Sequence, residues 1–149
     1  MKKRIVAVFL LALAGCDTLP RDPEGTVDRI RQSHTLAIGV ASPFIPPEAA
    51  RLLRALAHEN GARAIVRHGT LEPLIADLDA GRLDIVIAQQ SKRTPWNTLV
   101  APGPPLSVRG TGRDRLEWRA LMKNGENRWI MQVETASRRS APELSLIHI

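Results

Sequence analysis

The side chains best placed to do chemistry follow three short apolar runs in the sequence, at residues 36–40, 62–67 and 84–88. Polar and aromatic residues come soon after each run, namely Ser42, Phe44, Thr70, Gln89, Gln90, Ser91, Arg93 and Trp96. Amides and hydroxyls donate and accept hydrogen bonds, and a guanidinium can hold a carboxylate through two parallel bonds. The aromatic rings offer apolar faces. This set of side chains predicts a binding site for a small polar or anionic solute.

Patterns that would indicate catalysis are missing from the sequence. It has no Gly-x-Ser-x-Gly, no His-Glu-x-x-His and no phosphate-binding glycine loop. The histidines lie far apart and share no ligand spacing; they are His34, His58, His68 and His148. We therefore expect a protein that is not an enzyme and that binds no metal and no cofactor.

The net charge of +6 overstates how basic the folded part is, because Lys2, Lys3 and Arg4 carry three of those charges. The remaining arginines are scattered along the chain, whereas a nucleic-acid site gathers them on one surface. The charge pattern therefore predicts solvated surface arginines and no nucleic-acid partner.

The three apolar runs are separated by segments with helical periodicity. Pro47 suits the first position of a helix that ends at Gly61, and Thr70 caps a helix that ends at Gly81. Thr26 caps a short helix over 27–32. Apolar strands that alternate with amphipathic helices predict an α/β fold, with a parallel sheet covered on both faces in a three-layer lobe.

The sequence after the third run is less regular. Residues 89–112 are rich in proline and glycine, with short extended pieces at Val100 and 106–108. Residues 115–123 alternate apolar and charged side chains, which indicates a half-buried strand. Residues 127–138 fit both a hairpin strand and a helix, and the periodicity alone does not choose between them.

The N-terminus predicts export. Basic residues precede ten apolar residues at 5–14, too few for a transmembrane helix, which needs about 20. Leu13-Ala14-Gly15-Cys16 resembles the lipobox of bacterial lipoproteins. The resemblance implies that residues 1–15 are removed and that the Cys16 thiol takes a diacylglyceryl group, which anchors the chain in the bilayer. Asp17 resembles an inner-membrane retention signal, which implies the periplasmic face of that membrane.

Two stretches resemble the extracellular solute-binding protein family 3, the periplasmic receptors of amino-acid-type ABC importers. Residues 26–31 and 36–40, followed by Pro43-Phe44, resemble its opening helix, Gly-Val strand and proline–aromatic pair. Residues 74–88 resemble its helix, glycine turn and Asp-Ile strand. The resemblance covers residue 26 to about 101 and implies domain 1 of a type 2 periplasmic binding protein. It also favours a helix over 127–138.

The sequence departs from the family pattern in two places. Only about a dozen residues follow Pro102 before the next strand, where these receptors insert a second lobe. A single lobe is therefore expected, with the second lobe absent. The family's ligand-binding arginine falls at Trp96 or Asn97 here, and Arg93 lies nearby but out of register.

These inferences predict a signal peptide at 1–15, a tether at 16–25, a solute-binding-like lobe at 26–138 and a tail at 139–149. Residues 144–149 resemble read-through of a sequencing adapter. The expected function is that of a lipid-anchored component of an ABC importer that binds a small, polar, amino-acid-like solute and contacts the permease. Two alternatives stay open: a ligand-free scaffold for an inner-membrane protein, and a fragment of a two-lobed receptor.

Overall fold

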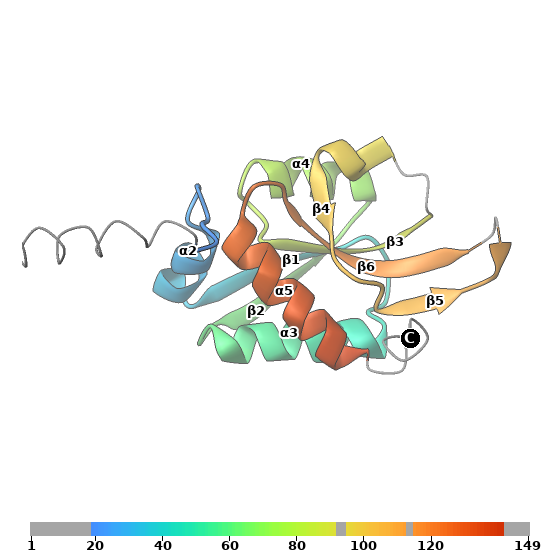
Figure 1. Cartoon of the computed structure of the whole chain (residues 1–149), viewed down its shortest axis with the longest axis horizontal. Coiled ribbons are helices and arrows are strands. Elements are labelled where there is room, and N and C mark those ends of the chain that lie inside the picture. Colours follow the sequence, from blue (N-terminus) through green and yellow to red (C-terminus); the bar gives the residue numbers. More distant parts are fainter. Residues whose placement is uncertain (1–18, 92–94, 113–114, 142–149) are drawn as a thin grey trace, which may run out of the picture.

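One mixed sheet with helices on both faces organises the molecule (Figure 1). The computed structural model describes residues 19–91, 95–112 and 115–141, so the predictions made for Cys16, Arg93 and residues 144–149 lie outside it. The helices are α2 (Thr26–Ser33), α3 (Pro47–Glu59), α4 (Leu71–Asp79), the 3-10 helix η1 (Pro95–Thr98) and α5 (Asn127–Ser140). The strands are β1 (Thr35–Val40), β2 (Arg63–His68), β3 (Ile85–Gln90), β4 (Val100–Pro102), β5 (Ser107–Arg109) and β6 (Leu116–Lys123).

The strands lie in the order β2–β1–β3–β6–β4, and β5 pairs with the other half of the β6 edge. β1 pairs in parallel with both β2 and β3, which confirms the three parallel strands predicted from the apolar runs. β6 runs antiparallel to β3, with Val86 opposite Leu121 and Gln90 opposite Glu117. The sheet is therefore mixed, and only its first half is parallel.

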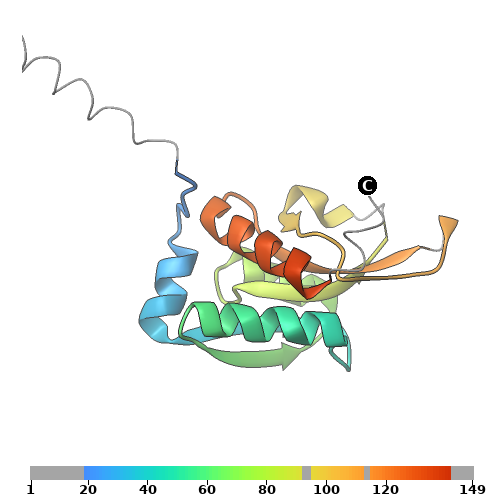
Figure 2. The ribbon, with the colours of Figure 1, turned by 60° about the horizontal axis from the view of Figure 1, so that its bottom comes forward.

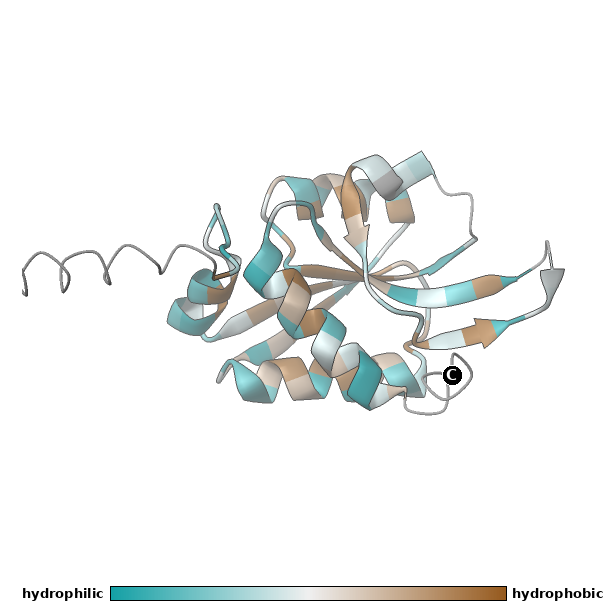
Figure 3. Ribbon diagram, in the orientation of Figure 1, coloured by the Kyte–Doolittle hydropathy of each residue, from teal (hydrophilic) through white to brown (hydrophobic). Residues whose placement is uncertain are grey.

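The second predicted strand, β2, is less buried than its composition suggests. All six of its residues are exposed, including Ile65 at 47% and Val66 at 40%. The reason is its place in the sheet: β2 pairs with β1 on one side and has no strand on the other side among the described residues. Covering helices protect the inner strands β1 and β3 on both faces (Figure 3).

Alternation along the strands divides the core into two layers. Ile38, Ile87 and Trp118 face α3 and α5, which pack side by side in Figures 1 and 2. Val86 and Leu121 face α4, on the other side of the sheet. The expected three-layer α/β arrangement is confirmed.

Proline and glycine mark the helix ends as predicted. α3 begins at Pro47, and Gly61 and Gly81 follow α3 and α4 with positive φ values of 60° and 71°. Gly39 serves a different purpose, because a Cβ built there would lie 2.8 Å from Leu83 Cδ1. The glycine lets α4 and the turn after it pack directly on β1.

The segment over 127–138, which the periodicity left open, is helical as the family resemblance favours. α5 extends from Asn127 to Ser140 and buries Trp129, Val133 and Ala136 against the sheet. Met131 lies on the outer face and is exposed.

The prediction that Thr26 caps the first helix is wrong. Thr26 is itself the first residue of α2, and the cap position is Gly25, in a left-handed conformation with no side chain to accept a bond. The free N–H groups of this helix end donate instead to carboxylates: Thr26 N to Glu126 Oε2 at 3.1 Å and Val27 N to Asp22 Oδ2 at 3.1 Å. Carboxylates at a helix N-terminus are favoured by the helix dipole.

Asp84 joins three elements at the amino end of the sheet. Its carboxylate accepts the Ala37 N–H at 2.8 Å and pairs with Arg29 Nη2 at 2.8 Å. Its carbonyl oxygen accepts the indole N–H of buried Trp129 at 2.8 Å. The residue therefore fixes α2, β1 and α5 to the start of β3 and has a structural role.

Candidate functional site

An open depression of about 580 Å³ lies at the carboxyl ends of β1, β2 and β3. Each of these strands contributes the residues that follow or end it. The lining residues are Ala41, Ser42, Pro43, His68, Gly69, Thr70, Leu71 and Gln89. In open α/β sheets, ligands bind at this edge of the parallel strands.

Ser42 makes two hydrogen bonds that fix the chain on the β1 side of the depression. Its hydroxyl accepts the Phe44 N–H at 3.2 Å, which turns the chain after the strand. Its carbonyl oxygen accepts a hydrogen bond from His68 Nδ1 at 2.6 Å. Because a carbonyl oxygen only accepts, Nδ1 carries a hydrogen, and this bond ties the ends of β1 and β2 together.

The β2 side leads directly into the N-terminus of α4. Thr70 occupies the cap position, as predicted, but its side chain makes no capping hydrogen bond. Pro73 has no N–H, and Leu74 N donates to the Thr70 carbonyl. The amides at Leu71 and Glu72 are thus the first-turn N–H groups without a helical partner, and they favour an anionic ligand group.

The two neighbouring glutamines at the end of β3 point to opposite faces of the sheet, as strand alternation requires. Gln89 is exposed and lines the depression. Gln90 is only 6% exposed, does not line it, and leaves its buried Nε2 without a hydrogen-bond partner. Gln89 is therefore the glutamine available to a solute.

The remaining predicted site residues lie around this edge but outside the depression. Phe44 is 54% exposed and stands edge-on to Trp118, with ring centroids 5.7 Å apart. Ser91 is exposed directly after β3, and Trp96 in η1 packs partly buried against the α4 layer. The structure thus brings Ser42, Thr70 and Gln89 together.

A partly buried ion cluster lies at the start of β6, the strand next to β3. Glu117, opposite Gln90, receives hydrogen bonds from Arg115 Nε at 2.7 Å and Arg119 Nε at 2.9 Å. Burial raises the pKa of this carboxyl, but the bonds and charges of the two arginines outweigh it and lower the pKa overall. Glu117 therefore stays ionised and holds the start of β6.

His68 lines the depression but is not among the site residues predicted from the sequence. The signal was present, because His68 ends a predicted strand and directly precedes Gly69 and Thr70. Within the described ranges, no group of three or more His, Cys, Asp or Glu side chains is placed to hold a metal ion. None of the helices over the same residues is long and apolar enough to cross a membrane.

The arrangement suits reversible binding of a small polar molecule. Hydroxyl, amide and imidazole groups line the depression, and the first-turn N–H groups of α4 favour a negatively charged ligand group. The residues lining it include no carboxylate.

No family model matches the chain, and no curated protein matches its sequence. Solved structures do match its fold. The arginine-bound form of domain 1 from TmArgBP superposes with a TM-score of 0.63, at 18% identity, over 75% of this chain and 98% of that domain. A tryptophan mutant of the same domain gives 0.64, again at 18% identity, over 76% and 96%. TmArgBP is the arginine-binding protein of T. maritima.

A third structure, an ancestral cationic amino acid solute-binding protein, matches with a TM-score of 0.48 at 23% identity, over 56% of this chain and 41% of that one. The TmArgBP matches span almost all of domain 1. β4 ends at Pro102 and β5 begins at Ser107, so the chain here continues within the same sheet. The described residues therefore have the α/β fold of domain 1 of a type 2 periplasmic binding protein, as a single lobe.

Proposed function

We propose that this chain binds a small, polar, amino-acid-like solute in the depression at the carboxyl ends of β1, β2 and β3. The observation that carries the proposal is the meeting of Ser42, Thr70 and Gln89 with the N-terminus of α4 at this one edge. Ligands of parallel α/β sheets bind at this edge.

The polar groups define how such a solute would be held. Its carboxylate lies against the N–H groups of Leu71 and Glu72 and the Thr70 hydroxyl, where the helix dipole favours negative charge. Its ammonium group donates to the side-chain oxygen of Gln89.

The TmArgBP structures support binding by one lobe. Domain 1 of that protein is known in an arginine-bound form, without a second domain to close over the ligand. By analogy, the single lobe here is sufficient to hold an amino-acid-like solute. Because the depression is open, the affinity is lower than that of a receptor that closes two lobes.

The setting we propose is the periplasmic face of the bacterial inner membrane. The lipobox-like run before Cys16 supports a lipid anchor on that residue, and Asp17 supports retention at the inner membrane. The protein then serves an ABC importer as a substrate-binding or accessory component and contacts its permease. It has no enzymatic role in this proposal.

A thermal-shift experiment tests the binding. The purified lobe is heated with each of a panel of amino acids and related polar metabolites. A ligand at about 100 times its Kd adds roughly 2.7 kcal/mol to the free energy of unfolding, which raises the melting temperature by several degrees. Thr70→Val removes the hydroxyl at the depression and reduces this shift. Thr135→Val removes a hydroxyl from the exposed side of α5 and leaves the shift unchanged.

The same experiment separates binding from the ligand-free alternative. A scaffold keeps one melting temperature with every solute and co-purifies with a membrane protein. If no member of the panel shifts the melting temperature while such a partner is recovered, solute binding is rejected.

A further inference from the structure

The segment before α2 is joined to the start of α5 by a set of carboxylate and backbone bonds, which we name the clasp: Arg21, Asp22, Glu24, Thr26, Glu126 and Asn127. Asp22 bridges two helix ends, with Oδ2 accepting Val27 N at 3.1 Å and Oδ1 accepting Trp129 N at 2.9 Å. Residues distant in the sequence thus share one polar junction.

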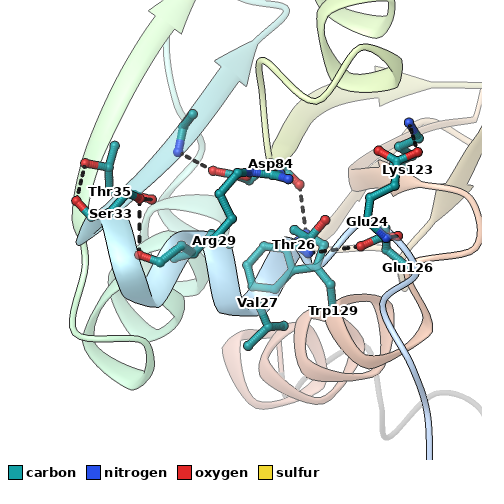
Figure 4. Close-up of polar contacts among 12 residues, drawn as sticks. Glu24, Thr26, Val27, Arg29, Ser33, Thr35, Asp84, Lys123, Glu126 and Trp129 are labelled. Atoms are coloured by element: carbon teal, nitrogen blue, oxygen red, sulfur yellow. Dashed lines mark hydrogen bonds and ion pairs between the residues drawn. The ribbon is translucent and has the colours of Figure 1, made fainter.

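Glu126 completes the clasp from the other side. It is 1% exposed, and its two oxygens accept Glu24 N at 2.9 Å and Thr26 N at 3.1 Å (Figure 4). Asn127 N donates to the Arg21 carbonyl oxygen at 3.0 Å, and Lys123 Nζ pairs with Glu24 at 2.6 Å. The chain is therefore fixed to the lobe from Arg21 onwards.

The clasp and the solute depression lie at opposite ends of the sheet. Glu126 follows the end of β6, and β6 runs antiparallel to β3, so the clasp lies at the amino end of β3 and of its parallel neighbour β1 (Figure 1). The depression begins at Ala41, just past its carboxyl end. The six residues of β1 separate the two by about 20 Å, at roughly 3.3 Å per residue.

Chain length then limits how the lobe can face a membrane. From Cys16 to Arg21 there are five residue steps, which reach at most about 17 Å when extended. Without the clasp, the free chain would extend from Cys16 to Thr26, which is ten residue steps, and would reach about 34 Å. The shorter length is less than the 20 Å between clasp and depression, and the longer one exceeds it.

We infer that the clasp keeps the open side of the depression from facing the bilayer, because it shortens the free chain between the lipid anchor and the lobe. This inference rests on the proposed lipid attachment at Cys16. For the open side of the depression to contact the bilayer, the free chain between Cys16 and Arg21 would have to span the whole length of β1. Five residue steps are too short for that. Solute, or a protein that covers the depression, must then approach from the aqueous side.

Energy transfer to a labelled membrane tests this orientation. The full acylated chain is reconstituted in phosphatidylcholine vesicles that contain an acceptor-labelled lipid. Donor dyes are attached to single cysteines, Ser33→Cys at the clasp end and Thr70→Cys at the depression. Cys16, the only native cysteine, is blocked by its acyl group. We expect transfer from the Ser33 position to exceed transfer from the Thr70 position several-fold.

The clasp itself is tested with Asp22→Asn/Glu126→Gln, whose fold is checked by circular dichroism. In this variant we expect the two transfer efficiencies to converge and trypsin to cut after Arg21 faster. Asp28→Asn, which removes an exposed ion pair between α2 and Arg128 of α5, is the matched control and keeps the difference. If the double variant does not fold, Asp22→Asn alone replaces it.

The outcomes distinguish a failure of the lipid anchor from a failure of the orientation. If the chain fails to bind vesicles, the lipid anchor is wrong, and the orientation is rejected with it. If the chain binds vesicles but both positions transfer equally, the anchor stands and the orientation is overturned. If the difference survives in the clasp variant, the orientation has another cause and the role of the clasp is rejected.

Discussion

Replacing Glu126 with glutamine tests whether the clasp stabilises the fold as the structure indicates. The carboxylate of Glu126 is buried and accepts two backbone N–H groups. Glutamine keeps the shape but offers only one acceptor oxygen. Its side-chain NH2 group then faces the second backbone N–H, and neither of these two donors has an acceptor. Hydrogen bonds to charged groups contribute about 1.5–3 kcal/mol each, and a buried donor without a partner costs about 1–3 kcal/mol.

We therefore expect Glu126→Gln to lower the free energy of unfolding at pH 7 by about 2–4 kcal/mol. For a lobe of this size, that lowers the melting temperature by roughly 8–16 °C. Asp28→Asn is again the control, because its ion pair to Arg128 is 60% and 40% exposed and contributes less than about 1 kcal/mol.

The pH dependence gives a second, independent test. Burial raises the pKa of Glu126, but the N–H of Glu24, the hydrogen bonds of Thr26 and the charge of Arg29 outweigh it, so the pKa lies below its ordinary 4.5. A lowered carboxyl pKa contributes stability above the unfolded value, and this is lost as the pH falls through the folded value. The gap between wild type and Glu126→Gln should therefore narrow below about pH 4.5.

Thermal melts followed by circular dichroism at pH 7 and at pH 3.5 measure both effects. Equal melting temperatures for the two proteins at pH 7 would refute the reasoning. So would a gap that stays the same size in acid.

Two further substitutions and one comparison variant test the core. Gly39→Ala places a Cβ 2.8 Å from Leu83 Cδ1 and should cost about 1–3 kcal/mol in urea unfolding, whereas Gly69→Ala, whose Cβ has an ordinary 3.5 Å contact, should change stability by less than about 1 kcal/mol. Equal effects of the two would contradict the packing argument. Trp129→Phe removes the indole N–H that Asp84 accepts and should cost about 1–3 kcal/mol; an unchanged urea midpoint would show that the bond contributes nothing.

The parallel half of the fold could be predicted from local sequence. Pro47, Gly61 and Gly81 mark helix ends for reasons of backbone geometry alone, and the structure places them there. The apolar content of residues 62–67 correctly indicated a strand but not its position in the sheet. An edge strand and a central strand can share a composition, and only the order of strands decides which is covered.

The clasp could not be predicted, because Asp22 and Trp129 are 107 positions apart and no local pattern links them. The helix over 127–140 was ambiguous for a similar reason: helix and strand both bury Trp129 and Val133 on one side. The two differ at Met131, which a strand would place on the side of Trp129, and at Ala136, which only a helix places there; in the structure Met131 is exposed and Ala136 is buried. At the site, alternation along β3 could have separated Gln89 from Gln90 in advance.

The outer edge of β2 affects how two copies of this lobe meet. Side-by-side antiparallel pairing of two such strands about a two-fold axis at Ile65 sets Arg63 of one molecule against Arg67 of the other. Like charges placed opposite each other disfavour pairing between the two strand edges, and natural proteins protect open strand edges with such charges. These basic residues therefore discourage copies of this lobe from polymerising through β2.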